Sequence, residues 1–202
     1  MINVYFIEDV LIDAGTDRAH KRILPQLAGR SVSAHALTHA HPDHYGSSHA
    51  VCEALGIPLW CGERDAHVVQ GARPLPGEGR VGALLTKLPL PAPHAVERKL
   101  KEGDEVAGFT VMETPGHSPG HVSFWRDSDR TLICGDVFFN LNPLTGRPGL
   151  HEPPRPLTHN VELNRESARR VARLQPALVL FGHGPPLRDT ERLVRFAQAL
   201  PG

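Results

Sequence analysis

The sequence contains few cysteines, no long apolar run and no excess of charge of either sign. Its three cysteines, Cys52, Cys61 and Cys134, form no C-x-x-C pair, which argues against a disulfide framework and favours a reducing compartment. No segment reaches the roughly 18 apolar residues that a membrane-spanning helix needs, and residues 1–7 resemble a strand more than a signal peptide. The 22 basic residues balance 22 acidic ones, which disfavours nucleic acid or an anionic membrane as a partner. We therefore expect a cytoplasmic protein that acts on a small molecule.

The length and composition fit one domain spanning residues 1–202. With 40% apolar and 22% charged residues, the chain can bury a sizeable core. Several expected strands are separated only by turn residues, which favours mixed sheets covered by helices over a purely parallel sheet. The expected strands are residues 2–7, 10–13, 32–38, 57–61, 96–100, 105–114, 121–126, 130–134 and 177–181. The expected helices are residues 18–28, 47–55, 63–70, 160–174 and 189–199.

Two segments are rich in proline and glycine. We expect residues 71–95 to form a loop with one short strand, because their apolar periodicity is weak. Residues 138–158 form a second such segment, and long segments of this kind inside a domain are often functional. The second segment is therefore either a lid over a site or a passive surface loop.

The most informative segment is His39-Ala40-His41-Pro42-Asp43-His44. If the preceding apolar residues form a strand, alternation keeps His39, His41 and Asp43 on roughly one side as the chain leaves the sheet. His44 projects differently and can serve a second centre. Neutral imidazole and carboxylate groups suit zinc, iron or manganese, whereas an unpartnered polar cluster of this kind is costly in a core.

Three later segments repeat one pattern, in which a strand is followed by a polar residue bracketed by glycine. They are residues 113–121, 132–136 and 178–185, and they offer His117, Asp136 and His183. Glycine lets the backbone turn tightly at each position, and loops at strand ends on a rigid sheet are where functional sites are commonly built. These three residues are further candidate ligands.

Together these motifs resemble those of the metallo-β-lactamase superfamily, in particular its glyoxalase-II-like metallohydrolase branch. The matching pieces occur in the superfamily's order along nearly the whole chain; they are Asp13-Ala14-Gly15, Thr38 to His44, Pro115-Gly116-His117, Gly135-Asp136 and Gly182-His183-Gly184. The resemblance implies an α/β (α+β) fold, a four-layer αββα sandwich of two mixed β-sheets flanked by helices, with a two-metal site at one edge of the sheets.

The resemblance also implies a role for each candidate. The first metal would be held by His39, His41 and His117, the second by Asp43, His44 and His183, with Asp136 bridging both. Asp13 would hydrogen-bond the histidine loop. Seven ligands also exceed the three protein ligands of a catalytic tetrahedral zinc, which independently favours two divalent ions. Zinc is the favoured metal, and iron and manganese fit the same ligand types.

The expected function is metal-dependent hydrolysis. A metal-bound hydroxide would attack an ester, thioester, lactone or similar bond, and Asp43 would orient the hydroxide and accept its proton. The short stretch after His183 leaves no room for the helical domain that contacts glutathione in full-length glyoxalase II, which argues against a glutathione thioester. The alternatives are a mononuclear non-haem iron oxygenase of the persulfide-dioxygenase type, with ligands like His39, His117 and Asp136, and a non-catalytic metal-binding scaffold.

The remaining histidines and aromatic residues receive weaker assignments. His121 is expected to support the ligands rather than to bind metal. Surface or core roles are expected for His20, His35, His49, His67 and His94. Contact with substrate competes with a packing or surface role for Tyr45, Phe138, Phe139, His151 and His159.

Overall fold

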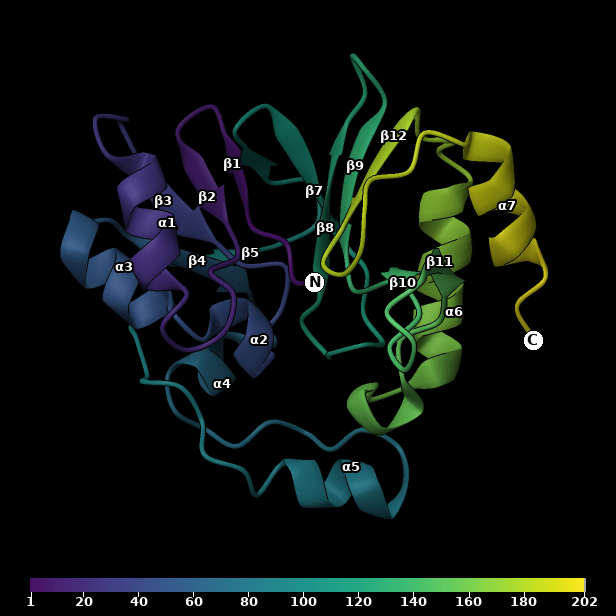
Figure 1. The fold of residues 1–202 in the computed structure, drawn as a ribbon, viewed down its shortest axis with the longest axis horizontal. Helices are drawn as coiled ribbons and strands as arrows, with labels where there is room; N and C mark the ends of the chain where they lie inside the picture. The colour runs from purple at the N-terminus through teal and green to yellow at the C-terminus, as the bar shows by residue number, and fades with distance from the viewer. Residues whose placement is uncertain (202) are drawn as a thin grey trace.

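Two five-stranded sheets face each other at the centre of the computed structural model, which describes residues 1–201 (Figure 1). In spatial order, the first sheet consists of β1 (Tyr5–Ile7), β2 (Val10–Ile12), β3 (Ala34–Ala36), β4 (Leu59–Gly62) and β5 (Arg98–Leu100). The second consists of β12 (Leu178–Phe181), β9 (Thr131–Gly135), β8 (Val122–Arg126), β7 (Phe109–Glu113) and β6 (Glu105–Val106). Both sheets are mixed, because β1 alone is antiparallel in the first and β12 alone pairs in parallel in the second.

Helices cover the outer face of each sheet, which completes the four layers in Figure 1. The first sheet packs against α1 (His20–Leu27), α3 (Ser48–Leu55) and α4 (Ala66–Val69), and the second against α6 (Val161–Ala172) and α7 (Thr190–Gln198). The αββα sandwich of two mixed sheets is therefore confirmed. Within residues 1–201, none of the helices combines the length and the apolar character needed to span a bilayer.

Alternation along the strands explains why the sheets are buried on both faces. In β2, Leu11 packs against the helices of the first layer, whereas Val10 and Ile12 point between the sheets. In β9, Leu132 belongs to the core under α6 and α7, whereas Ile133 points between the sheets. Successive side chains of a strand point to opposite faces, so continuous apolar runs produce strands with two buried faces.

The expected strand over residues 105–114 is interrupted. It forms β6 and β7, an antiparallel hairpin in which Val106 pairs with Phe109. The two turn residues, Ala107 and Gly108, have φ angles of 49° and 73°. Two-residue hairpin turns with positive φ at both positions match the twist of the flanking strands, which explains the break.

The two segments rich in proline and glycine contain more structure than expected. Residues 71–95 include α5 (Gly79–Leu85), so the expectation of a loop with a short strand was wrong. The second segment forms the hairpin of β10 (Phe139–Leu141) and β11 (Pro148–His151), followed by a 3₁₀ turn, η1 (Arg155–Leu157). The two segments meet, because the backbone N–H of Glu78 donates to the carbonyls of Arg155 (3.0 Å) and Thr158 (3.1 Å). Figure 1 shows α5 standing apart from both sheets, on the side of the molecule where α2 (Pro42–Tyr45) lies.

Candidate metal centre

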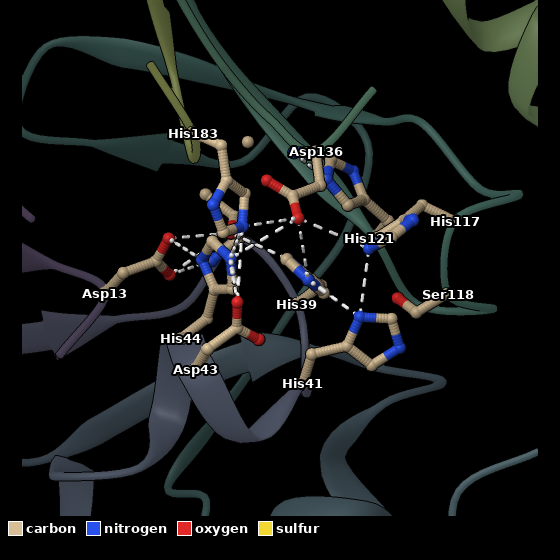
Figure 2. A network of polar contacts seen from close by, with 12 residues as sticks. Asp13, His39, His41, Asp43, His44, His117, Ser118, His121, Asp136 and His183 are labelled. Atoms are coloured by element: carbon tan, nitrogen blue, oxygen red, sulfur yellow. Dashed lines mark hydrogen bonds and ion pairs between the residues drawn. The ribbon is translucent and has the colours of Figure 1, made fainter. Parts of the chain in front are cut away.

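The loops at one edge of the two sheets bring all seven candidate ligands together (Figure 2). Four come from the loop after β3, and the others follow β7, β9 and β12. Their ligand atoms form a first group, His39, His41 and His117, and a second group, Asp43, His44 and His183. A third group, His39, His44 and Asp136, overlaps both, and within each of the three groups all ligand atoms lie within 4.8 Å of one another.

The first group consists of three imidazoles. Nδ1 of His41 lies 2.9 Å from Nε2 of His117 and 3.1 Å from Nε2 of His39. The second group combines imidazoles with a carboxylate: Nε2 of His183 lies 3.2 Å from Oδ2 of Asp43 and 3.3 Å from Nε2 of His44.

Asp136 lies between the two groups. Its Oδ2 atom is 3.3 Å from Nε2 of His117 in the first group and 3.3 Å from Nε2 of His183 in the second. It is also 3.4 Å from Nε2 of His44 and 3.7 Å from Nε2 of His39. One carboxylate oxygen therefore faces both groups of ligands.

Hydrogen-bond partners fix which nitrogen of each ring faces the first group. The hydroxyl of Thr38 donates to Asp13, so it accepts the Nδ1–H of His39 at 3.0 Å. The hydroxyl of Thr158 donates to the Pro154 carbonyl, so it accepts the Nδ1–H of His117. In neutral rings, Nε2 of both histidines then carries a lone pair. Both lone pairs point at Nδ1 of His41, which has at most one hydrogen, so a cation satisfies this arrangement better than hydrogen bonds.

The second group follows the same logic. Oδ2 of Asp13 accepts the Nδ1–H of His44 at 2.8 Å, so Nε2 of His44 faces Asp136 and His183 and would offer its lone pair there in the neutral ring. Asp136 also has a buried Oδ1 atom with no hydrogen-bond partner in the described part of the chain. Buried carboxylate oxygens without donors are costly unless a cation or a proton is near. Five imidazoles and two carboxylates thus fit a pair of divalent cations of the zinc, iron or manganese type.

The ionisation of His39, His41 and Asp136 agrees with their ligand chemistry. Burial, together with the neighbouring imidazoles, holds the pKa of His39 well below its usual value and lowers the pKa of His41 to about 3. Burial opposes ionisation of Asp136, but the surrounding histidines outweigh it and hold the pKa of Asp136 well below its usual value. Neutral imidazoles and an anionic carboxylate are the forms that bind metals. In contrast, the neighbouring carboxylates outweigh burial and raise the pKa of His44 well above its usual value and the pKa of His183 to about 9, so these two rings would release a proton when a cation binds.

His121 supports the bridging carboxylate from behind. Its Nε2 atom accepts the backbone N–H of Asp136 at 3.0 Å, and its Nδ1 atom lies 2.8 Å from Oγ1 of Thr114. His121 belongs to none of the three groups, in agreement with its expected supporting role. Gly135 makes this contact possible, because its φ is 53° and a Cβ atom there would lie 2.7 Å from Nε2 of His121. A Cβ atom on Gly182 would likewise collide with Oδ1 of Asp136.

Asp65 is a supporting residue that the sequence analysis missed. It is 1% exposed and accepts the backbone N–H of Ala40 at 2.9 Å, the backbone N–H of Gly120 at 2.7 Å and the hydroxyl of Ser118. It thereby joins the loop of His39 and His41 to the loop of His117. Its only sequence signal is a carboxylate before a short helix, which is ordinarily explained as an N-cap. The side chain makes no such capping bond here.

The other candidates divide between the core and the site. Tyr45 is buried in the first core, which favours its packing role. Phe138 is likewise buried, whereas the Phe139 ring packs against His183 with centroids 4.4 Å apart and lines a cleft. His35 is a core histidine between the Leu11 carbonyl and Ser48, and burial lowers its pKa to about 4.

The candidate metal centre opens into a cleft of about 510 Å³. His41, Asp43, His117, Asp136 and His183 form its floor. Its walls come from residues 74–90, which include part of α5, and from residues 139–157. Both segments rich in proline and glycine therefore border the site, and the lid role of the second one stays a prediction.

Comparisons with known proteins agree with the motifs. A family model described as "Metallo-beta-lactamase superfamily" matches residues 1–183. The chain is 29% identical over 202 residues to the probable metallo-hydrolase YybB of Bacillus subtilis, covering 96% of this chain and 86% of that protein. It is also 29% identical over 149 residues to a hydroxyacylglutathione hydrolase of Bdellovibrio bacteriovorus, covering 72% of this chain but 46% of that enzyme.

A solved structure of TTHA1623 in a di-iron-bound form is similar throughout. Its TM-score is 0.70 at 32% identity, with 93% of this chain and 90% of that chain covered. The resemblance inferred from the motifs is therefore confirmed. The superfamily binds divalent metals, and the di-iron form of this similar protein leaves zinc and iron both open for the present chain.

Proposed function

The chain belongs to the metallo-beta-lactamase superfamily of metallohydrolases. From that premise we propose that it uses two divalent cations to hydrolyse a neutral ester, thioester or lactone with an apolar acyl group. The first cation would be held by His39, His41 and His117, the second by Asp43, His44 and His183, and both by Asp136. The observation that carries this proposal is the position of Asp136, whose Oδ2 atom lies 3.3 Å from a nitrogen of each group. When bound, two such cations lower the pKa of a shared water and polarise the acyl oxygen of the substrate.

Asp43 is the residue that we assign to proton handling. Burial alone would raise its pKa, but the hydrogen bond from His183 and the charges of His44 and His183 together outweigh burial and lower the pKa to about 2. Its side chain is 37% exposed and borders the cleft, so it is anionic and accessible to water. An anionic carboxylate beside the attacking water orients that water and accepts its proton.

The walls of the cleft support a neutral, apolar substrate. Leucines from both segments line it, among them Leu75, Leu88 and Leu157, which are each about half exposed. None of the described residues that line the cleft is a lysine or arginine. A glutathione thioester carries two carboxylates that would find no lysine or arginine among these residues, whereas an acyl chain would cover the exposed leucines.

The persulfide-dioxygenase type of reaction is less well supported. A single iron held by His39, His117 and Asp136 would leave the convergent group of Asp43, His44 and His183 without a role. The partial similarity to hydroxyacylglutathione hydrolase and the wider similarity to a probable metallo-hydrolase both favour hydrolysis.

The test is a hydrolysis screen on protein loaded separately with zinc, iron and manganese. The panel contains esters, thioesters and lactones of increasing acyl length, together with phosphodiesters and β-lactams. We expect acyl substrates to be cleaved without oxygen, and we expect Asp136→Ala to lose about 100-fold or more in rate while its circular dichroism is unchanged. Asp129→Ala is the matched control, because Asp129 forms a surface ion pair with Arg126. Full activity of Asp136→Ala, or oxygen uptake with persulfide by a protein containing one iron, would contradict the proposal.

A further inference from the structure

A second cluster of metal-ligating side chains lies on the outer side of the first sheet. His49 and Glu53 are four residues apart on α3, so they occupy the same face of the helix. His94 reaches them from the segment that joins α5 to β5. Nδ1 of His94 lies 3.2 Å from Nδ1 of His49 and 3.9 Å from Oε1 of Glu53. The ligand atoms of all three lie within 4.8 Å of one another, and none of the three belongs to the centre described above.

We propose that His49, Glu53 and His94 form a separate binding site for a divalent transition-metal ion such as zinc. Two imidazole nitrogens bound to one tetrahedral zinc at about 2.0–2.1 Å lie roughly 3.3 Å apart, close to the separation here. The planes of the two rings are inclined by 67°, so the rings present nitrogens to each other instead of stacking. Two imidazoles and one carboxylate form a ligand set that zinc uses with a water in the fourth position.

The site is largely preformed. The backbone N–H of His94 donates to the Val69 carbonyl at 3.0 Å, and its side chain is only 12% exposed. Glu53 is 65% exposed, so its carboxylate can close the longer distance by a change of rotamer. Only the most exposed of the three side chains, Glu53, has to move.

A cation at this site would anchor the segment that follows α5. His94 stands near the end of that segment, and Leu88 and Leu90 within it line the cleft. A cation that joins His94 to α3 would therefore fix one end of the segment whose residues Leu88 and Leu90 line the cleft. The role we infer for the ion is structural, because His49, Glu53 and His94 do not line the cleft.

The experiment measures zinc bound per chain in metal-buffered titrations of the whole protein, with elemental analysis. We expect the wild type to bind one equivalent more than His94→Gln, and Glu53→Gln to bind this equivalent roughly tenfold or more weakly. His151→Gln and Glu191→Gln are the matched controls, because neither residue belongs to a cluster of possible ligands in the described chain. The side chain of Glu53 is exposed, so Glu53→Gln should leave the fold intact, and weaker zinc binding by this variant would not result from misfolding.

Hydrogen exchange gives a second readout that does not depend on catalysis. Zinc should slow amide exchange in residues 88–96 of the wild type and of Asp136→Ala, but not of His94→Gln. If wild type, Glu53→Gln and His94→Gln bind equal zinc throughout the titration, the proposal is wrong. Because Asp136→Ala disrupts the main centre only, failure of this proposal and failure of the proposed hydrolase are separable.

Discussion

At the scale of single residues, buried carboxylates determine which atoms of the histidines face the candidate metal centre. Asp13 accepts hydrogen bonds from the backbone and hydroxyl of Thr38 and from Nδ1 of His44, which directs Nε2 of His44 toward Asp136. Asp65 performs the equivalent task for the backbone, because it holds Ala40 and Gly120 at fixed positions. Outer partners of this kind commonly affect metal affinity strongly, since they orient the ligands.

Asp65→Asn tests this role. The amide nitrogen would replace an oxygen that now accepts hydrogen bonds, so at least one buried donor from Ala40, Ser118 or Gly120 would lose its partner. We expect cation affinity at the main centre to fall about 10- to 100-fold, with the secondary structure retained. Competitive zinc titration measures the change, and Asp17→Asn is the control because Asp17 is highly exposed. Equal affinity in Asp65→Asn and wild type would show that the two loops hold their positions without this carboxylate.

The sequence predicts the residues of the site better than it predicts their supports. All seven candidate ligands converge, because each stands in a motif at a strand end where short spacing and glycine restrict its position. Their roles as ligands stay predictions. Asp65 has no such signal, because its function arises only when α4 meets two loops that are distant in sequence.

At the scale of elements, the sequence predicts a helix or strand correctly where its apolar residues follow one clear pattern. The strands β2, β3 and β9 lie within expected ranges or differ by one residue, because their apolar runs are buried on both faces. The helix α5 was missed because its short sequence contains two glycines and buries little apolar surface, so helix propensity and periodicity are both weak. It is positioned by tertiary contacts, including those of Glu78 with Arg155 and Thr158.

The segments that form the cleft walls give a prediction about substrate size. Leu75 and Leu88 line the cleft and are exposed by 51% and 55%, so the double replacement Leu75→Ser with Leu88→Ser should leave stability nearly unchanged. Each replacement would weaken the binding of a long acyl chain by about 1 kcal/mol, because less apolar surface would be buried. We expect KM for an octanoyl ester to rise about tenfold or more and KM for an acetyl ester to stay constant.

The control for that prediction is Leu144→Ser, since Leu144 is 94% exposed and lies outside the cleft lining. Steady-state kinetics on a series of acyl lengths provide the measurement. An equal rise in KM for acetyl and octanoyl esters would show that these leucines affect the site generally and do not hold the acyl chain.

At the scale of the whole molecule, the candidate metal centre joins two halves of the sandwich. His39, His41, Asp43 and His44 extend from the first sheet, whereas His117, Asp136 and His183 come from turns of the second. The N-terminal segment makes a further link, because Asn3 donates to the carbonyls of Phe181, Gly182 and Gly184 around His183. Cations held by both halves would therefore act as cross-links between the two sheets.

Removal of the metal should accordingly destabilise the entire fold. A ligand at 100 times its Kd stabilises a folded protein by about 2.7 kcal/mol per site, provided that it binds only the folded state. We expect the free energy of unfolding in urea to fall by about 3 kcal/mol or more when a chelator replaces saturating zinc. The free energy of unfolding of Asp136→Ala should change much less when the chelator replaces zinc, because this variant lacks the carboxylate that both groups of ligands share. Identical urea curves for the wild type with zinc and with chelator would mean that the two sheets are held together by their apolar interface alone, and that the convergence of the seven side chains does not serve to bind cations.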